Sequence, residues 1–276
     1  HCSAFRTGLE TLAGADPALL IEFGADDLTA VVSCTDEATA LGLADRLRRM
    51  TGVRVKAGAP GVIYAERLAA PVEVDFTHKR QTGFEGQFAR VKLRFEPLAE
   101  DAGFVFESRI SGGAVPAEFI PAVEHGLQMA RQNGVLAGYP VSDFRAVLVD
   151  GAYHDRDSSP LAFEIAARGA FRELRRAGDV RLMEPVMNVD VHGAGQFAGL
   201  VRSVMRARGA EEIATINADT EGPLLFEAPL VRLLGLEAEL ADRMQSVAHV
   251  RLVYSGLREV PRRPGGGDDT YLSDLG

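Results

Sequence analysis

Short segments with strand-like and helix-like hydrophobic patterning follow one another along almost the whole chain. Residues 72–77 and 88–95 alternate apolar and polar side chains, which is typical of half-buried strands. Apolar residues at three- and four-residue spacing predict helices that begin after Pro116 and Pro160. The 276 residues allow one large domain or two to three small ones. The sequence therefore predicts an α+β fold composed of two-layer sandwiches.

The first predicted domain covers residues 1–70. Its patterning gives the order helix (Ser3–Ala13), strand, strand, helix, with a last strand at Val53–Val55. Asp36 is placed to cap the second helix. This is the ferredoxin-like order β-α-β-β-α-β without its first strand, so we expect that residues before His1 were cut away, are disordered or are supplied elsewhere. The alternative is that the first helix begins a different small fold.

Two further domains and a tail are predicted. Residues 71–178 contain four strands, a helix after Pro116 and a helix capped by Ser159, with Leu161 on the latter's apolar face. Residues 179–261 repeat strand, helix, strand, strand, helix, strand, which predicts a second ferredoxin-like unit. Residues 262–276 lack apolar periodicity and are expected to form a mobile tail.

Composition excludes several classes of protein. The net charge is −9, so any contact with RNA must depend on local basic patches or on shape. No run of about eighteen apolar residues occurs, so we expect no membrane partner. The two cysteines cannot form a disulfide framework and suit a reducing cytosol, so we expect a cytoplasmic protein. We expect it to be a monomer.

No catalytic or cofactor site is predicted. The chain has no GxxxxGK[ST] phosphate loop, and Asp219–Gly222, which matches DxxG, is interpreted as a turn. No metal is expected, because the cysteines and the histidines lack ligand spacing. His154 lies near two serines, but a triad needs three-dimensional orientation. We therefore interpret Ser158 and Ser159 as helix caps.

Two polar segments remain as candidate functional sites. One is basic and runs from Thr77 to Gly83 into a glycine-containing turn; the other runs from Asp150 to Ser159. Imidazole and phenol rings can stack on unpaired bases, and lysine and arginine can contact phosphates. The alternative is an ordinary solvated hairpin and an ordinary helix entry. The residues alone favour neither.

Several blocks resemble the elongation factor G family. The strongest resemblance is to its domain IV, and it rests on Val72–Gly83, Gly86–Val91, Gly103–Ser108, Gly112–Pro116, Phe119–Val123, Val149–Gly151 and Tyr153–Ser159. Leu182–Met187 resembles the beginning of domain V and Glu259–Pro261 its end. The first segment fits domain III. The sequence is thus identified as similar to domains III, IV and V, without a GTPase domain in this chain.

The resemblance implies a fold and a function. It implies ferredoxin-like domains III and V flanking a domain IV with a left-handed βαβ crossover. It implies that the partner is the ribosome, including ribosomal RNA and the tRNA–mRNA in the decoding region. The RNA-binding tip would consist of two loops, with the residues His154, Tyr153, Asp155, Lys79, Arg80, Gly83, Gly86 and Gln87. No cofactor is implied in this chain, since GTP and magnesium would bind the GTPase domain.

The sequence departs from the family pattern at three places. Phe84 and Glu85 stand where the tip usually has small residues, and a carboxylate there would repel phosphate. The blocks at Ser33–Leu41 and Met244–Val247 also differ, which implies a divergent member with weaker coupling to GTP hydrolysis. We expect the ribosome-binding part of a translocase. The alternative is a ribosome-binding regulator or ribosome-protection factor without a GTPase.

Overall fold

The computed structural model describes residues 2–24, 28–34, 37–82, 85–215, 222–244 and 249–261. The chain divides into two compact units. One comprises His1–Val62 and Met187–Tyr254, and the other comprises Ile63–Val186 and Ser255–Gly276. Helices occur beside parallel and antiparallel strand pairs. The predicted α+β fold class is therefore confirmed.

The N-terminal part of the first unit is a small helix-and-hairpin structure. Its elements are α1 (Cys2–Ala15), β1 (Leu20–Phe23), β2 (Ala30–Ser33) and α2 (Glu37–Thr51). Leu9, Leu12 and Leu47 are buried between them. The strand predicted at Val53–Val55 is wrong, because residues 52–64 form no helix or strand. Val55 packs against the small core, but residues 53–55 form no backbone ladder with another described strand. The capping residue predicted at Asp36 lies outside the described residues.

The C-terminal part of the first unit has its own core, which includes Val201, Met205 and Leu240. Its elements are the last residues of β9 (Val180–His192), η2 (Gly195–Phe197), α6 (Ala198–Ala207), β10 (Glu211–Thr215), β11 (Leu224–Pro229), α7 (Leu230–Leu233), α8 (Leu236–Met244) and most of β12 (His249–Glu259). β11 and β12 both pair with β9, and β10 pairs with β11. The helix predicted over 230–244 is two helices, because Gly235 adopts a left-handed backbone conformation (φ 73) between them.

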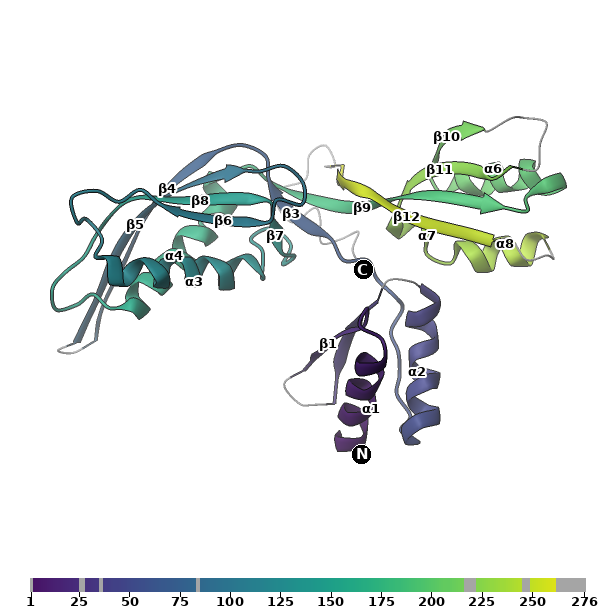
Figure 1. The fold of residues 1–276 in the computed structure, drawn as a ribbon, viewed down its shortest axis with the longest axis horizontal. Helices are drawn as coiled ribbons and strands as arrows, with labels where there is room; N and C mark the ends of the chain where they lie inside the picture. The colour runs from purple at the N-terminus through teal and green to yellow at the C-terminus, as the bar shows by residue number, and fades with distance from the viewer. Residues whose placement is uncertain are drawn as a thin grey trace. The chain divides into compact units, whose positions relative to one another are not determined.

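The second unit contains a four-stranded sheet in the order β4-β5-β8-β6. Its elements are β3 (Ala65–Leu68), β4 (Val72–Thr82), β5 (Glu85–Pro97), β6 (Phe104–Ser108), η1 (Ala117–Phe119), α3 (Ile120–Arg131), β7 (Val141–Ser142), β8 (Phe144–Ala152), α4 (Pro160–Arg172), α5 (Leu174–Ala177) and the start of β9. Helices α3 and α4 lie side by side against one face of this sheet (Figure 1). The predicted position of Leu161 is wrong: it is 54% exposed, while Phe163 and Phe171 are buried.

The other face of the sheet carries ion pairs between neighbouring strands. Arg90 binds Asp75 and Asp150, and Lys92 binds Glu73 at 2.6 Å. The hydrogen bond from Arg90 lowers the pKa of the Asp75 carboxyl below its ordinary value. Because these side chains are partly solvated, each pair adds little stability. Along β4 and β5 these charged residues alternate with buried apolar residues. The helices therefore cover the apolar face of the hairpin and leave the charged face to solvent.

A buried carboxylate links β3 to the segment that follows α3. Glu66 is fully buried, and its two oxygens accept hydrogen bonds from five consecutive backbone N–H groups, those of residues 135–139, at 2.7–3.2 Å. Gly134 precedes this nest with φ 58, and a Cβ there would lie 2.5 Å from Glu66 Oε1. The carboxylate therefore determines the path of residues 134–139.

Candidate nucleic-acid interface

The first candidate segment is the end of a long hairpin rather than a loop. β4 and β5 pair from Val72↔Phe95 to Thr82↔Glu85, so Lys79, Arg80 and Gln87 all lie in paired strands. Successive residues of a strand point to opposite faces. Arg80 is therefore on the face of Val74 and Phe76, whereas Lys79 is on the opposite face. Both are exposed. The basic segment thus places positive charge on both faces of the hairpin.

Two polar side chains link the strands near this end. His78 Nε2 donates a hydrogen bond to Gln87 Oε1 at 3.1 Å, although the two residues are not directly opposite. Arg80 is the residue opposite Gln87. Cross-strand contacts of this kind stabilise one register of a hairpin. The hairpin therefore stays paired beyond the part that α4 covers.

The second candidate segment follows β8 and is hydrogen-bonded to the hairpin. Ser158 Oγ donates to Phe88 O at 2.6 Å and accepts from His154 N at 2.9 Å. Phe88 N donates to Asp157 O at 2.8 Å, and Ser158 N donates to His154 O at 3.0 Å. These four bonds close a tight turn over residues 154–158 and fasten it to β5. Residues 153–158 together with β5 residues 86–88 are called the tip below.

The imidazole of His154 lies on the surface of the tip. Its side chain is 57% exposed, and Nδ1 lies 3.3 Å from both Arg156 N and Asp157 Oδ2. A ring nitrogen accepts from Arg156 N–H when it carries no proton, and donates to the Asp157 carboxylate when it carries one, so only one contact is a hydrogen bond at a time. Either contact occupies Nδ1 within the tip. Nε2 is then the ring nitrogen available to a partner.

The close approach of the two segments favours glycine at position 86. A Cβ at this position would lie 2.6 Å from the carboxyl carbon of Asp157. Only glycine lets the strand pass so close to that carboxylate without displacing it. The Asp157 side chain is 40% exposed, so a modest shift could relieve the contact at the cost of the local geometry. The sequence predicted Gly86 for the tip, but not this reason for it.

The structure brings together some of the predicted site residues. His154 Nδ1 lies 3.3 Å from the Asp157 carboxylate, Gly86 packs closely against the same carboxylate, and Gln87 adjoins Gly86 in β5. Tyr153, which is 44% exposed, and Asp155 are on the surface of the same turn. Gly83 lies outside the described residues. The assignment of all eight residues to RNA binding stays a prediction.

Sequence reasoning missed two contributors to the tip. Phe88 takes part through its backbone N–H and carbonyl groups, which no side-chain pattern reveals. The prediction that Ser158 is a helix cap is wrong. Ser159 is the cap and accepts from Ala162 N at 3.2 Å, as predicted, while Ser158 joins the turn to β5. Two adjacent serines before a helix proline gave no signal for this difference.

The described residues offer little support for other chemistry. The Ser158 hydroxyl contacts backbone groups of Phe88 and His154 rather than an imidazole, so it lacks the base that a nucleophilic serine needs. Among the residues with described placement, no three His, Cys, Asp or Glu side chains form a metal-binding group. Across the same residues, no helix is long and apolar enough to cross a membrane.

Comparisons with known proteins define the class. Residues 60–179 match the family model "Elongation factor G, domain IV". A crystal structure of a Thermus thermophilus protein superposes with a TM-score of 0.73 at 32% identity, over 94% of this chain and 39% of that chain. The four-stranded sheet, its two helices and the tip therefore place the chain among proteins that contain this domain together with flanking α+β segments.

The particular family follows from two curated relatives. Elongation factor G of Hyphomonas neptunium is 45% identical over 92% of this chain, and elongation factor G of Wolbachia pipientis is 36% identical over 92%. The chain belongs to the elongation factor G family and corresponds to its C-terminal region. It spans 36% and 37% of the length of these two relatives.

Proposed function

We propose that this chain is the ribosome-engaging part of an elongation factor G-type translocase, which promotes movement of tRNA and mRNA during protein synthesis. The observation that carries the proposal is the tip, where an exposed imidazole is attached by backbone and hydroxyl hydrogen bonds to a long paired hairpin. Membership of the elongation factor G family supports it. The expected compartment is the cytoplasm, and the expected partners are ribosomal RNA and the tRNA–mRNA of the decoding region.

The chemistry of the tip suits RNA. The ring of Tyr153 and the ring of His154 are both substantially exposed, so each can stack on an unpaired base or donate a hydrogen bond to it. Lys79 and Arg80 on opposite faces of the hairpin can approach phosphates from two sides. Asp155 and Asp157 carry negative charge, so the tip would recognise a shaped RNA site rather than any polyanion.

The same arrangement suits transmission of movement rather than catalysis. The hydrogen bonds of Ser158 and Phe88 connect the turn directly to β5, which continues into the buried sheet. A displacement of that sheet therefore moves the turn with it. The energy for translocation would come from GTP hydrolysis with magnesium at a site outside these 276 residues, which contain no GxxxxGK[ST] loop.

A chimeric factor tests this function. The corresponding C-terminal region of the Hyphomonas neptunium elongation factor G would be replaced by this chain, and single-round translocation would be followed by stopped-flow fluorescence of labelled mRNA. We expect the chimera to translocate, and His154→Ala to slow the step at least several-fold while binding to ribosomes persists. The matched control is His125→Ala, whose side chain is also exposed but pairs with Glu164 on the helical layer. Equal rates for both variants would remove the tip from the mechanism.

A further inference from the structure

A second surface of the same unit carries concentrated positive charge. Four arginines occur within nine residues, although the whole chain has a net charge of −9: Arg168, Arg172, Arg175 and Arg176. The last three are exposed, and Arg168 is 51% exposed and paired with Glu164. We call these four residues the arginine cluster.

The arginine cluster occupies one face because α4 continues almost directly into α5. Glu173 joins the two helices with helical backbone angles, and Ala177 N donates to Glu173 O at 2.8 Å in the helical pattern. Residues spaced by four, seven and eight then share one side of the helix. Phe163, Phe171 and Leu174 occupy the other side and are buried against the sheet. The arginines therefore face solvent for a structural reason.

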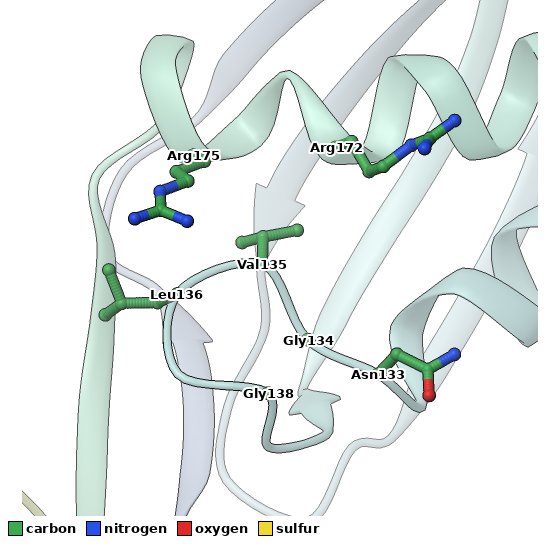
Figure 2. A pocket seen from close by; sticks show the side chains of 7 residues that line it. All are labelled: Asn133, Gly134, Val135, Leu136, Gly138, Arg172 and Arg175. Carbon is green, nitrogen blue, oxygen red and sulfur yellow. The ribbon is translucent and has the colours of Figure 1, made fainter. Parts of the chain in front are cut away.

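A hollow of about 330 Å³ lies beside the arginine cluster. Residues 133–136 and Gly138 form one wall, and Arg172 and Arg175 form the other. Figure 2 shows both arginines on the helical segment above the loop, with the Arg175 side chain directed toward Leu136. The loop amides of 135–139 point to Glu66 and are not available to a ligand. The positive charge at the hollow therefore comes from guanidinium groups.

The charge of two cluster members is not neutralised within the described part of the chain. Arg172 and Arg176 have no ion-pair partner among the residues whose placement is described, in contrast to Arg168. Arg175 already has an interaction within the protein, so nothing below depends on it. Guanidinium groups bind phosphate through paired N–H donors and are weakly hydrated, which makes them effective phosphate contacts.

We propose that Arg172 and Arg176 of the arginine cluster, beside this hollow, bind the sugar–phosphate backbone of RNA, as a second contact separate from the tip. The proposal rests on the proposed ribosomal function and names an additional surface for it. Arg172 lies twelve residues along α4 from Pro160, which is roughly 18 Å at 1.5 Å per residue. The tip and the arginine cluster thus mark opposite ends of one helix, and one RNA-lined site could engage both. Contacts to phosphate carry no sequence information, so binding at the cluster is independent of base sequence.

Salt-dependent RNA binding tests the proposal. The probe is a fluorescein-labelled RNA stem-loop, and anisotropy with the chain would be measured from about 50 to about 200 mM KCl. Each duplex phosphate contact contributes about 0.9 to the slope of log affinity against log salt. The double variant Arg172→Gln with Arg176→Gln removes two contacts. It should therefore make this negative slope shallower by about 1.8 and weaken binding at low salt. The matched control is Arg48→Gln with Arg49→Gln, an equal charge change at two exposed arginines at the end of α2.

Each outcome decides for or against the cluster. A salt slope that becomes shallower only in the Arg172 and Arg176 variant supports the proposal. An unchanged slope, or an equal change in the Arg48 and Arg49 control, overturns it. Displacement of the RNA by polyglutamate of equal charge would also overturn it, because the surface would then fit an acidic protein segment. Co-sedimentation of the unmodified chain with ribosomes separates the two hypotheses: if it persists while the cluster fails, the proposed function stands without this surface.

Discussion

The hydroxyl of Ser158 is the most informative single group in the tip. Replacing it by Ser158→Ala removes a hydrogen bond to Phe88 O at 2.6 Å and one from His154 N at 2.9 Å. A neutral hydrogen bond contributes about 0.5–1.5 kcal/mol net, so two give about 1–3 kcal/mol. Because the bond to His154 is exposed and water can replace it, we expect about 1–2 kcal/mol. The loss should act on the attachment of the turn rather than on the buried sheet.

Hydrogen exchange of individual amides measures this loss where it occurs. A local destabilisation of about 1–2 kcal/mol corresponds to about 5- to 30-fold faster exchange. The amides of His154 and Phe88 should show it, since Phe88 N donates to Asp157 O across the same junction. Ser108→Ala, at an exposed position in β6, serves as the control and should leave both amides unchanged. Unchanged exchange in Ser158→Ala would refute the view that this hydroxyl fastens the tip.

Three further changes have defined outcomes. Glu66→Gln replaces one acceptor oxygen by a donor amide and leaves at least two buried N–H groups unsatisfied. It should therefore lower the free energy of unfolding, measured in urea, by about 2–6 kcal/mol. Glu118→Gln, at an exposed site, should leave this free energy unchanged. Arg90 lowers the pKa of Asp75, so this ion pair stabilises the folded state fully above the ordinary carboxyl pKa, and the stabilisation is lost as pH falls through the lowered pKa. Asp75→Asn should therefore make the free energy of unfolding fall less steeply between about pH 5 and about pH 2. Gly86→Ala should push the Asp157 carboxylate away and shift the NMR signals of residues 153–158 while the buried sheet keeps its spectrum; an unperturbed tip would contradict the close approach.

Most of the fold was predictable because burial leaves a periodic record in the sequence. Alternation in β5 and three- and four-residue spacing in α3 correspond to faces that are buried in the structure. Ser159 and Pro160 marked the first turn of α4 correctly. The pattern gave the wrong face for Leu161, because alanines and Gly169 supply much of the buried surface of that helix. Small residues carry little hydrophobic signal, although they let a helix approach a sheet closely.

The candidate site was predictable in its residue types but not in its geometry. The segment Thr77–Gly83 reads as polar loop because Lys79 and Arg80 interrupt the apolar alternation, yet backbone pairing continues to Thr82. The junction between Phe88 and residues 157–158 is made by backbone groups and one hydroxyl, which leave no periodic trace. The sequence also did not predict that Glu66 binds the backbone N–H groups of residues 135–139, because backbone groups leave no sequence pattern and a single glutamate in a short strand resembles a solvated residue.

Directed hydroxyl-radical cleavage tests the central claim most directly. In the chimeric elongation factor G, with all other cysteines replaced, Tyr153→Cys would carry an iron chelate at the tip, and Arg206→Cys would carry it on α6 as the reference position. Both factors would be bound to ribosomes, and cleavage of ribosomal RNA would be mapped by primer extension. We predict that position 153 cleaves small-subunit RNA around the decoding region and that position 206 does not. Ribosome-bound factor whose position 153 leaves the decoding region uncut would contradict the account.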